Sequence, residues 1–181
     1  TGTTPVFLVG FPRSGTTLLN TILRSHPSVD VAEEPPTGQY IRSEIRKLPI
    51  SSQNNFPNLE KEQLAKVRDK YYQILEQYLE TDLNNAPPIV VDKLPLRSVE
   101  AGLLTSVFPQ AKFIFAVRHP CDCVLSCFMN RFAINQAMAN FFNLSDAAGL
   151  YHRVMSLWNQ HVDNFKLPVH YVYYENIVNN F

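Results

Sequence analysis

V-F-L-V-G-F-P-R-S-G-T-T-L-L, at residues 6–19, is the stretch from which the architecture follows. An apolar, β-branched run ends at Gly10, and leucines recur at helical spacing after Thr16, so the stretch predicts a strand, a short loop and a helix. Gly10 and Gly15 have the spacing of the glycines in a Walker A loop, whose backbone N–H groups converge on a phosphate. We therefore expect the loop at 10–17 to bind a phosphate or sulfate group.

The loop departs from Walker A in its cation. Walker A continues with Lys-Ser/Thr after the second glycine, whereas here Thr16 and Thr17 follow Gly15 and the cation is Arg13, inside the loop. Nucleotide hydrolysis at such loops uses the lysine and a Mg²⁺ held by the Ser/Thr and a downstream Asp. The V-V-D at residues 90–92 is only a weak imitation of that aspartate segment. The residues favour metal-free group transfer; a P-loop kinase or NTPase and a non-catalytic nucleotide-binding module are the alternatives.

Short apolar runs alternate with helical periodicity along the rest of the chain. Strands are predicted at 29–32, 89–91, 113–117 and 169–173, and helices near 41–48 and from Asn58, Ser98, Pro120 and Ser145. Strands separated by helices favour a parallel sheet, because parallel neighbours need a crossover connection. We expect an α/β fold, a P-loop-NTPase-like three-layer sandwich with a central parallel sheet flanked by helices. Ligands of such sheets bind beyond the carboxyl ends of the strands, where Gly10, Lys93 and Arg118 all lie.

Composition limits the classes of function. The chain has 181 residues, the size of one domain, with 16 Lys and Arg against 16 Asp and Glu. A formal net charge of zero argues against a broad nucleic-acid-binding surface. No apolar run approaches the roughly 18 residues of a membrane span, and the N-terminus lacks the features of a signal peptide. We expect a cytoplasmic chain without a membrane segment, or one in the Golgi lumen if an anchor lies outside it.

The cysteines do not have the spacing of a metal site. Cys121, Cys123 and Cys127 fall within seven positions, without the paired gaps and histidine partners of zinc ligands. We expect them to be small buried residues on a helix, and we expect no metal site.

Two segments resemble the nucleotide-binding segments of the PAPS-dependent sulfotransferases, where PAPS is 3′-phosphoadenosine 5′-phosphosulfate. Residues 7–19, F-L-V-G-F-P-R-S-G-T-T-L-L, resemble the family's 5′-phosphosulfate loop. The resemblance implies that this group is bound by Arg13, Ser14, Gly15, Thr16 and Thr17. Residues 111–131, A-K-F-I-F-A-V-R-H-P-C-D-C-V-L-S-C-F-M-N-R, are similar to the 3′-phosphate segment. This similarity implies that Arg118 and Ser126 hold the 3′-phosphate, with Arg131 as a further candidate, and the planar guanidinium suits phosphate.

The branch that the chain resembles most contains the tyrosylprotein sulfotransferases and bacterial sulfotransferase domains attached to tetratricopeptide repeats. S-H-P-S-V-D-V-A-E-E-P at 25–35 and V-D-K-L-P at 91–95 are similar to segments of that branch. The resemblance implies Glu34 as the general base and Lys93 and Arg13 as catalytic cations, while the residues themselves leave open whether Glu33 or Glu34 faces the site. A tyrosine near the nucleotide maps onto Tyr174.

The resemblance also implies what the chain acts with. The co-substrate would be PAPS, the product 3′-phosphoadenosine 5′-phosphate (PAP), and the acceptor a hydroxyl group of a protein tyrosine, a carbohydrate or a small molecule. The sequence is compatible with the formation of an oligomer. Family members continue beyond the tyrosine strand through a loop that covers the nucleotide, so residues 1–181 are expected to be a single sulfotransferase domain without its C-terminal portion.

Overall fold

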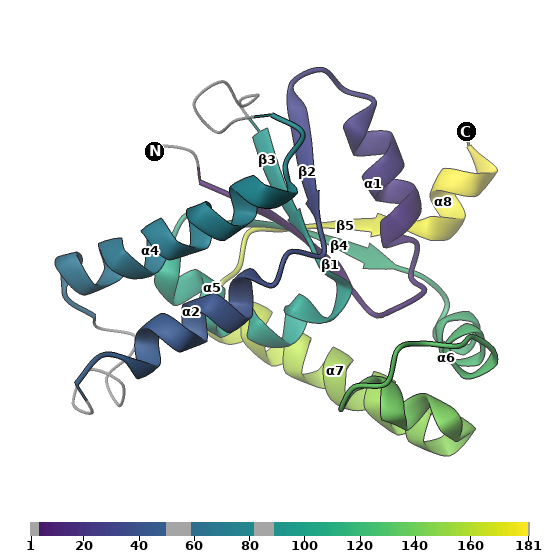
Figure 1. The fold of residues 1–181 in the computed structure, drawn as a ribbon. Helices are drawn as coiled ribbons and strands as arrows, with labels where there is room; N and C mark the ends of the chain where they lie inside the picture. Colours follow the sequence, from purple (N-terminus) through teal and green to yellow (C-terminus); the bar gives the residue numbers. More distant parts are fainter. Residues whose placement is uncertain (1–3, 50–58, 82–88, 181) are drawn as a thin grey trace.

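A five-stranded parallel sheet forms the centre of the molecule (Figure 1). The computed structural model describes residues 4–49, 59–81 and 89–180. The strands lie in the order β2-β3-β1-β4-β5, and every neighbouring pair is parallel. They are β1 (Val6–Gly10), β2 (Val29–Glu33), β3 (Ile89–Lys93), β4 (Lys112–Val117) and β5 (Val169–Tyr173). The predicted α/β fold with a central parallel sheet is confirmed.

Helices connect the strands, as a parallel sheet requires. The α-helices are α1 (Thr16–Arg24), α2 (Thr37–Arg46), α4 (Lys61–Leu75), α5 (Ala101–Val107), α6 (Pro120–Met129), α7 (Leu144–Phe165) and α8 (Tyr174–Asn179). Short 3₁₀ segments in the described part of the chain are η2 (Glu76–Tyr78), η3 (Pro95–Glu100) and η4 (Met138–Phe142). No helix within the described ranges is long and apolar enough to cross a membrane.

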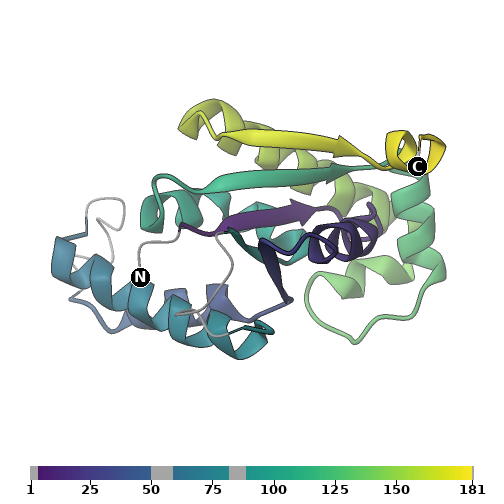
Figure 2. The same ribbon diagram turned by 90° about the horizontal axis from the view of Figure 1, so that it is seen from above.

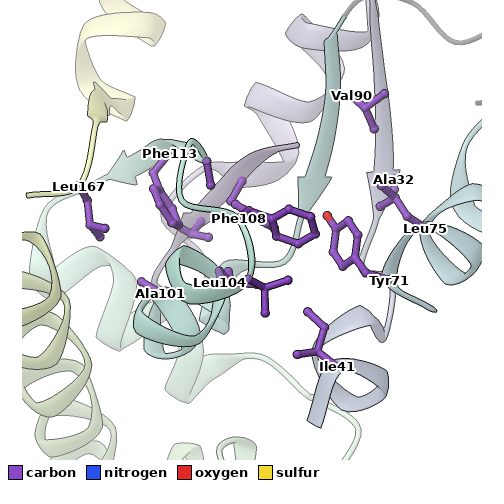
Figure 3. Packing of buried hydrophobic residues seen from close by; sticks show 14 of the residues in the cluster. Ala32, Ile41, Tyr71, Leu75, Val90, Ala101, Leu104, Phe108, Phe113 and Leu167 are labelled. Carbon is purple, nitrogen blue, oxygen red and sulfur yellow. The ribbon is translucent and has the colours of Figure 1, made fainter. Parts of the chain in front are cut away.

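The alternation of side chains along β1 produces the layers. Phe7 and Val9 point to one face, into a core with residues of α2, α4, α5 and α7, and Leu8 points to the other face, toward α1 and α8. Tyr71 of α4, Leu104 of α5 and the adjoining Phe108 meet in the larger core (Figure 3). Both faces of the sheet are therefore covered, as in other all-parallel sheets.

Helix α6 contributes a third cluster of buried residues, beyond the sheet. Cys123 and Cys127 of α6 pack with Phe11 and Phe141, and desolvation raises the pKa of both thiols to about 12. The predicted burial of these two cysteines is confirmed, whereas the same prediction for Cys121 is wrong, because Cys121 is exposed. Figure 2 shows that the carboxyl ends of the strands point toward the side where α6 lies.

Several helix starts differ from the predictions. Asn58 lies outside the described residues, and Glu60 caps α4 through a capping box with Gln63. Ser98 is buried within η3, so Glu100 rather than Ser98 precedes α5. Asn143 caps α7, because its side chain accepts the N–H groups of Ser145 and Asp146.

Helix α2 begins at Thr37, earlier than the helix predicted near 41–48. The hydroxyl of Thr37 donates a hydrogen bond to Oδ2 of Asp92 at 2.9 Å. This bond spans 55 positions of sequence, so no local pattern could reveal it.

Candidate active site

The loop between β1 and α1 is held by close backbone contacts. A Cβ at Gly10 would lie 2.8 Å from the carbonyl oxygen of Ala116 on β4, so only glycine fits there. Gly15 has a φ of 98° in the left-handed region, and a Cβ on it would lie 2.6 Å from the ring of Tyr174. Arg13 is also left-handed, with a φ of 68°. These restraints turn the chain tightly before α1.

The start of α1 is suited to an anion. Gly15 occupies the cap position and has no side chain that could cap the helix. The first N–H groups of a helix have no intrahelical partner. Together with the positive end of the helix dipole, they attract negative charge. Thr16 and Thr17 stand in this first turn, and both line the cavity described below.

Ser14 does not line this cavity, unlike Arg13 and Thr16. Its N–H closes the turn onto the carbonyl of Phe11 at 3.1 Å. Its hydroxyl is buried beside Gly10 and has no hydrogen-bond partner within the described ranges. The structure therefore does not bring Ser14 into the cavity, and its role as a ligand stays a prediction.

Arg13, Arg118 and Ser126 come together from three elements. Nε of Arg13 donates a hydrogen bond to Oγ of Ser126 on α6 at 3.0 Å. Arg118, just beyond β4, donates from Nη1 to the carbonyl oxygen of Arg13 at 3.3 Å. Residues predicted for the two phosphate ends of the nucleotide thus form one connected group.

Tyr174 supports this group from the side of α8. The guanidinium of Arg118 lies over the Tyr174 ring, 4.6 Å from its centroid, in a cation–π contact. The carboxylate of Asp122 is 3.6 Å from Nη2 of Arg118. Nε of Arg118 is buried and unpartnered among the residues described. A buried donor without a partner calls for one, such as a water molecule or a bound ion.

Glu175 fixes α8 to the start of α6. Its Oε1 accepts the backbone N–H of His119 at 2.9 Å, and this hydrogen bond lowers the pKa of the Glu175 carboxyl. The contact holds Tyr174, the neighbouring residue, against Arg118.

Lys93 stands between two glutamates at the ends of β2 and β3. Its Nζ donates to Oε1 of Glu33 at 2.9 Å and to Oε1 of Glu34 at 3.1 Å. The Lys93 side chain is 3% exposed, whereas about half of each carboxylate side chain is exposed. The hydrogen bond from Lys93 lowers the pKa of the Glu33 carboxyl. The strand register, which pairs Glu33 with Lys93, produces this arrangement.

A cavity of about 380 Å³ joins the loop to this ion pair. Its polar lining is Arg13, Thr16, Thr17, Glu34, Lys93 and Asn135. Its apolar walls are Pro12, Leu94, Pro95, Leu96, Phe132 and Met138. Glu34, Lys93 and Arg13 therefore face one space, while Glu33 does not line it. This arrangement places one carboxylate and two cations beside the start of α1.

Behind β3 lies a buried polar network that the sequence reasoning missed. Asp92 is fully buried and accepts hydrogen bonds from the hydroxyls of Thr37 at 2.9 Å and Tyr71 at 3.1 Å. Nε of Arg97, also buried, is 3.4 Å from Oδ1 of Asp92. Burial raises the pKa of Asp92, and the charge of Arg97 opposes this shift. Asp92 thus points to the opposite face of the sheet from Lys93. In the sequence, the only indication of such a network is a charged residue at the end of an apolar strand.

A model of the sulfotransferase family matches residues 5–181, so the chain belongs to the sulfotransferase family. It is 34% identical over 149 residues to an uncharacterised protein of Aquifex aeolicus, covering 76% of this chain and 18% of that protein. It is 27% identical over 160 residues to a protein-tyrosine sulfotransferase of Drosophila melanogaster, covering 87% of this chain and 30% of that protein. The chain therefore spans less than a third of the length of these two relatives.

Solved structures show the same fold. A crystal structure of a sulfotransferase from Mycobacterium avium superposes with a TM-score of 0.60 at 16% identity, over 99% of this chain and 61% of that one. The sulfotransferase domain from the curacin biosynthetic pathway gives a TM-score of 0.54 at 21% identity, over 98% of this chain and 69% of that one. These likenesses confirm the predicted α/β fold.

Proposed function

We propose that this chain is the catalytic part of a sulfotransferase that moves the sulfuryl group of PAPS to a hydroxyl acceptor. One observation carries the proposal: Arg13 is hydrogen-bonded to Ser126 and Arg118, and it also lines the cavity that contains Lys93 and Glu34. The loop thus connects the residues that would bind the 3′-phosphate to the cavity in which transfer would take place. Membership of the sulfotransferase family supports the same reading.

The nucleotide would be held at both of its phosphate ends. The N–H groups at the start of α1, with the hydroxyls of Thr16 and Thr17, would bind the 5′-phosphosulfate. Arg118 and Ser126 would bind the 3′-phosphate, which distinguishes PAPS from ordinary adenine nucleotides. Nε of Arg118, which is buried and has no partner among the residues that the structure describes, fits this role, because a charge-assisted hydrogen bond would satisfy it.

The cations would act on charge that develops during transfer. By analogy with phosphoryl transfer, catalysis at sulfur is mainly positioning and electrostatic stabilisation. As the bond between the acceptor oxygen and sulfur forms, the bond from sulfur to the 5′-phosphate oxygen breaks. Lys93 and Arg13 would stabilise negative charge on the sulfuryl and leaving oxygens. The products are a sulfate ester and PAP.

Glu34 would take the proton of the acceptor hydroxyl. Glu34 lines the cavity with Lys93, whereas Glu33 does not, although both carboxylates contact the same ammonium. General base catalysis of this kind contributes roughly 10²- to 10⁴-fold in rate. Glu33 would keep Lys93 in position when Glu34 turns toward the acceptor.

The environment of Asp92 argues against a kinase or NTPase. A Walker B aspartate must face the loop to hold Mg²⁺. Asp92 instead binds Thr37, Tyr71 and Arg97 behind the strand. The non-catalytic binding module makes a different prediction, because it binds the nucleotide but transfers nothing.

Thermal-shift measurements with PAP, ADP and ATP, each with and without Mg²⁺, test the proposal, since a ligand that binds only the native state raises its melting temperature. We expect PAP to give the largest shift, independent of Mg²⁺, and ³⁵S from labelled PAPS to appear on an acceptor. A larger, Mg²⁺-dependent shift with ATP would support a kinase. Binding of PAP without transfer to any acceptor would support the non-catalytic module.

A further inference from the structure

An apolar cavity of about 410 Å³ adjoins the candidate active site. Its lining includes Phe128, Phe132, Ile134, Met138, Phe141 and Phe142. Phe132 and Met138 also line the cavity of Lys93 and Glu34. These two side chains are therefore the wall that both cavities share.

The base of the apolar cavity is fixed and its rim is open. Phe141 is 4% exposed, and its ring centroid lies 5.2 Å from that of Phe132 and 6.1 Å from that of Phe11, next to the loop. At the rim, Ile134 and Phe142 are 77% and 72% exposed. Large apolar side chains exposed beside a cavity are typical of a ligand-binding surface.

Most of the charged side chains that line the two cavities already have a role in the proposed transfer. Among the described residues that line the apolar cavity, Arg131 is the only charged one. The charged residues of the neighbouring cavity, Arg13, Lys93 and Glu34, have roles in the proposed transfer. A sugar with many hydroxyls or a strongly acidic peptide would find few polar partners there, since Asn130 and Arg131 are the polar side chains among the described lining residues, and unpaired polar groups are costly to bury.

We propose that the acceptor is an uncharged hydroxyl compound with an apolar body, which lies in the cavity of Ile134 and Phe142 while its hydroxyl reaches Glu34 past Phe132 and Met138. This inference rests on the proposed sulfotransferase function. It assigns substrate selectivity to the segment between α6 and α7, which contributes Phe132, Ile134 and Met138.

A series of para-alkyl phenols tests the inference. In 4-methyl-, 4-propyl- and 4-pentylphenol the acidity of the hydroxyl is nearly constant while the apolar area grows. Each buried methylene contributes a transfer free energy that corresponds to about a fourfold change in kcat/KM. With saturating PAPS, we expect kcat/KM to rise along the series, and N-acetylglucosamine and a tyrosine peptide flanked by aspartates to be poorer acceptors than 4-pentylphenol.

Substitutions at the rim identify the cavity that is used. We expect Ile134→Ser and Phe142→Ser to flatten the dependence of kcat/KM on alkyl length, and both positions are exposed enough for the fold to tolerate the change. Leu125→Ser is the matched control, because Leu125 is exposed on α6 and lines a separate apolar cavity. The control should keep the wild-type slope.

The outcomes separate this inference from the proposed function. If PAP stabilises the protein and a phenol is sulfated, but kcat/KM does not depend on alkyl length, the apolar acceptor is refuted and the sulfotransferase stands. Preference for the acidic peptide or the sugar refutes it equally. If PAP does not bind and no acceptor is sulfated, both proposals fail together.

Discussion

Nε of Arg13 and Oγ of Ser126 lie 3.0 Å apart although 113 positions of sequence separate them. The hydrogen bond ties the loop after β1 to the middle of α6, and Arg118 reinforces it by bonding to the carbonyl of Arg13. The protein itself therefore fixes the spacing between the candidate sites for the two phosphate ends of the nucleotide. Preorganisation of this kind lowers the cost of binding.

Replacement of Lys93 should separate nucleotide binding from transfer. Lys93→Met keeps most of the buried volume of the side chain but removes its positive charge. In the proposed reaction this charge acts together with that of Arg13 to stabilise the leaving group. We expect kcat to fall by about 10²-fold or more, the magnitude typical of losing one electrostatic donor, with PAP affinity retained within a few fold. Isothermal titration with PAP and a ³⁵S transfer assay measure the two quantities, and full activity in Lys93→Met would contradict the assigned role.

The two glutamates provide a matched pair of variants. We expect Glu34→Gln to reduce kcat by about 10²- to 10⁴-fold, the range for loss of a general base, because Glu34 lines the cavity. Glu33→Gln should have a much smaller effect on kcat, because Glu33 contacts Lys93 but does not line the cavity. The reverse order of the two effects would make Glu33 the base.

Arg118→Gln should weaken binding mainly through the 3′-phosphate. A hydrogen bond to a charged group contributes about 1.5–3 kcal/mol, so we expect PAP affinity to fall by roughly 10- to 100-fold. The affinity for AMP, which lacks the 3′-phosphate, should fall much less, through the loop that Arg118 also contacts. Asp122→Asn is the control, since it removes a carboxylate that competes for Arg118 and should not weaken PAP binding. An equal loss for PAP and AMP would refute the assignment.

Gly15→Ala should destabilise the fold for two reasons. Its φ of 98° is strained for any residue with a Cβ, at a cost of about 1–2 kcal/mol, and the added methyl would meet the Tyr174 ring. Urea denaturation should show this loss, and Tyr174→Ala in the same chain should recover only the steric part. Gly149→Ala, within α7, is expected to be neutral or stabilising.

Breaking the Asp92 network should cost more than any surface change. Asp92→Ala leaves the buried Arg97 without its carboxylate, and loss of one partner of a buried pair costs about 3–5 kcal/mol. Asp92→Asn, which keeps an acceptor for Thr37 and Tyr71, should cost less. Urea denaturation compares the two, and a cost for Asp92→Ala below about 1 kcal/mol would show that the pair does not support the native state.

The pKa of Glu33 predicts a pH dependence of stability. Its folded-state pKa is lowered by the hydrogen bond from Lys93, so the pair stabilises the native state above the ordinary glutamate pKa of about 4.3. This contribution is lost as the pH falls through the lower, folded-state pKa. The difference in free energy of unfolding between wild type and Glu33→Gln should be constant near neutral pH and shrink below about pH 4. A difference that grows on acidification would contradict the shift.

The sequence predicted those features that depend on local patterns. Glycine spacing and apolar runs predicted the loop and the parallel sheet, and the position of Lys93 and Arg118 at strand ends predicted that they would meet near the loop. Family resemblance added Ser126 and Tyr174, whose contacts with Arg13 and Arg118 the structure shows.

Features that depend on distant contacts could not be predicted in this way. The hydrogen bond between Thr37 and Asp92 spans 55 positions of sequence. Thr37 is also the first residue of α2, which begins before the apolar residues that indicate a helix. The direction of the Ser14 hydroxyl depends on the close approach of β1 to β4. The apolar cavity draws on Phe132 and Ile134 in a segment without helical or strand periodicity.

The pairing of Glu33 with Lys93 is a matter of strand alignment as much as of residue identity. Side chains alternate along a strand, so a slip of β3 by one residue would turn Asp92 toward the loop and Lys93 into the larger core. Such a chain would keep its helices and much of its apolar packing but lose the cation. An inactive variant with native-like circular dichroism could therefore report misaligned strands while every reacting group is still present.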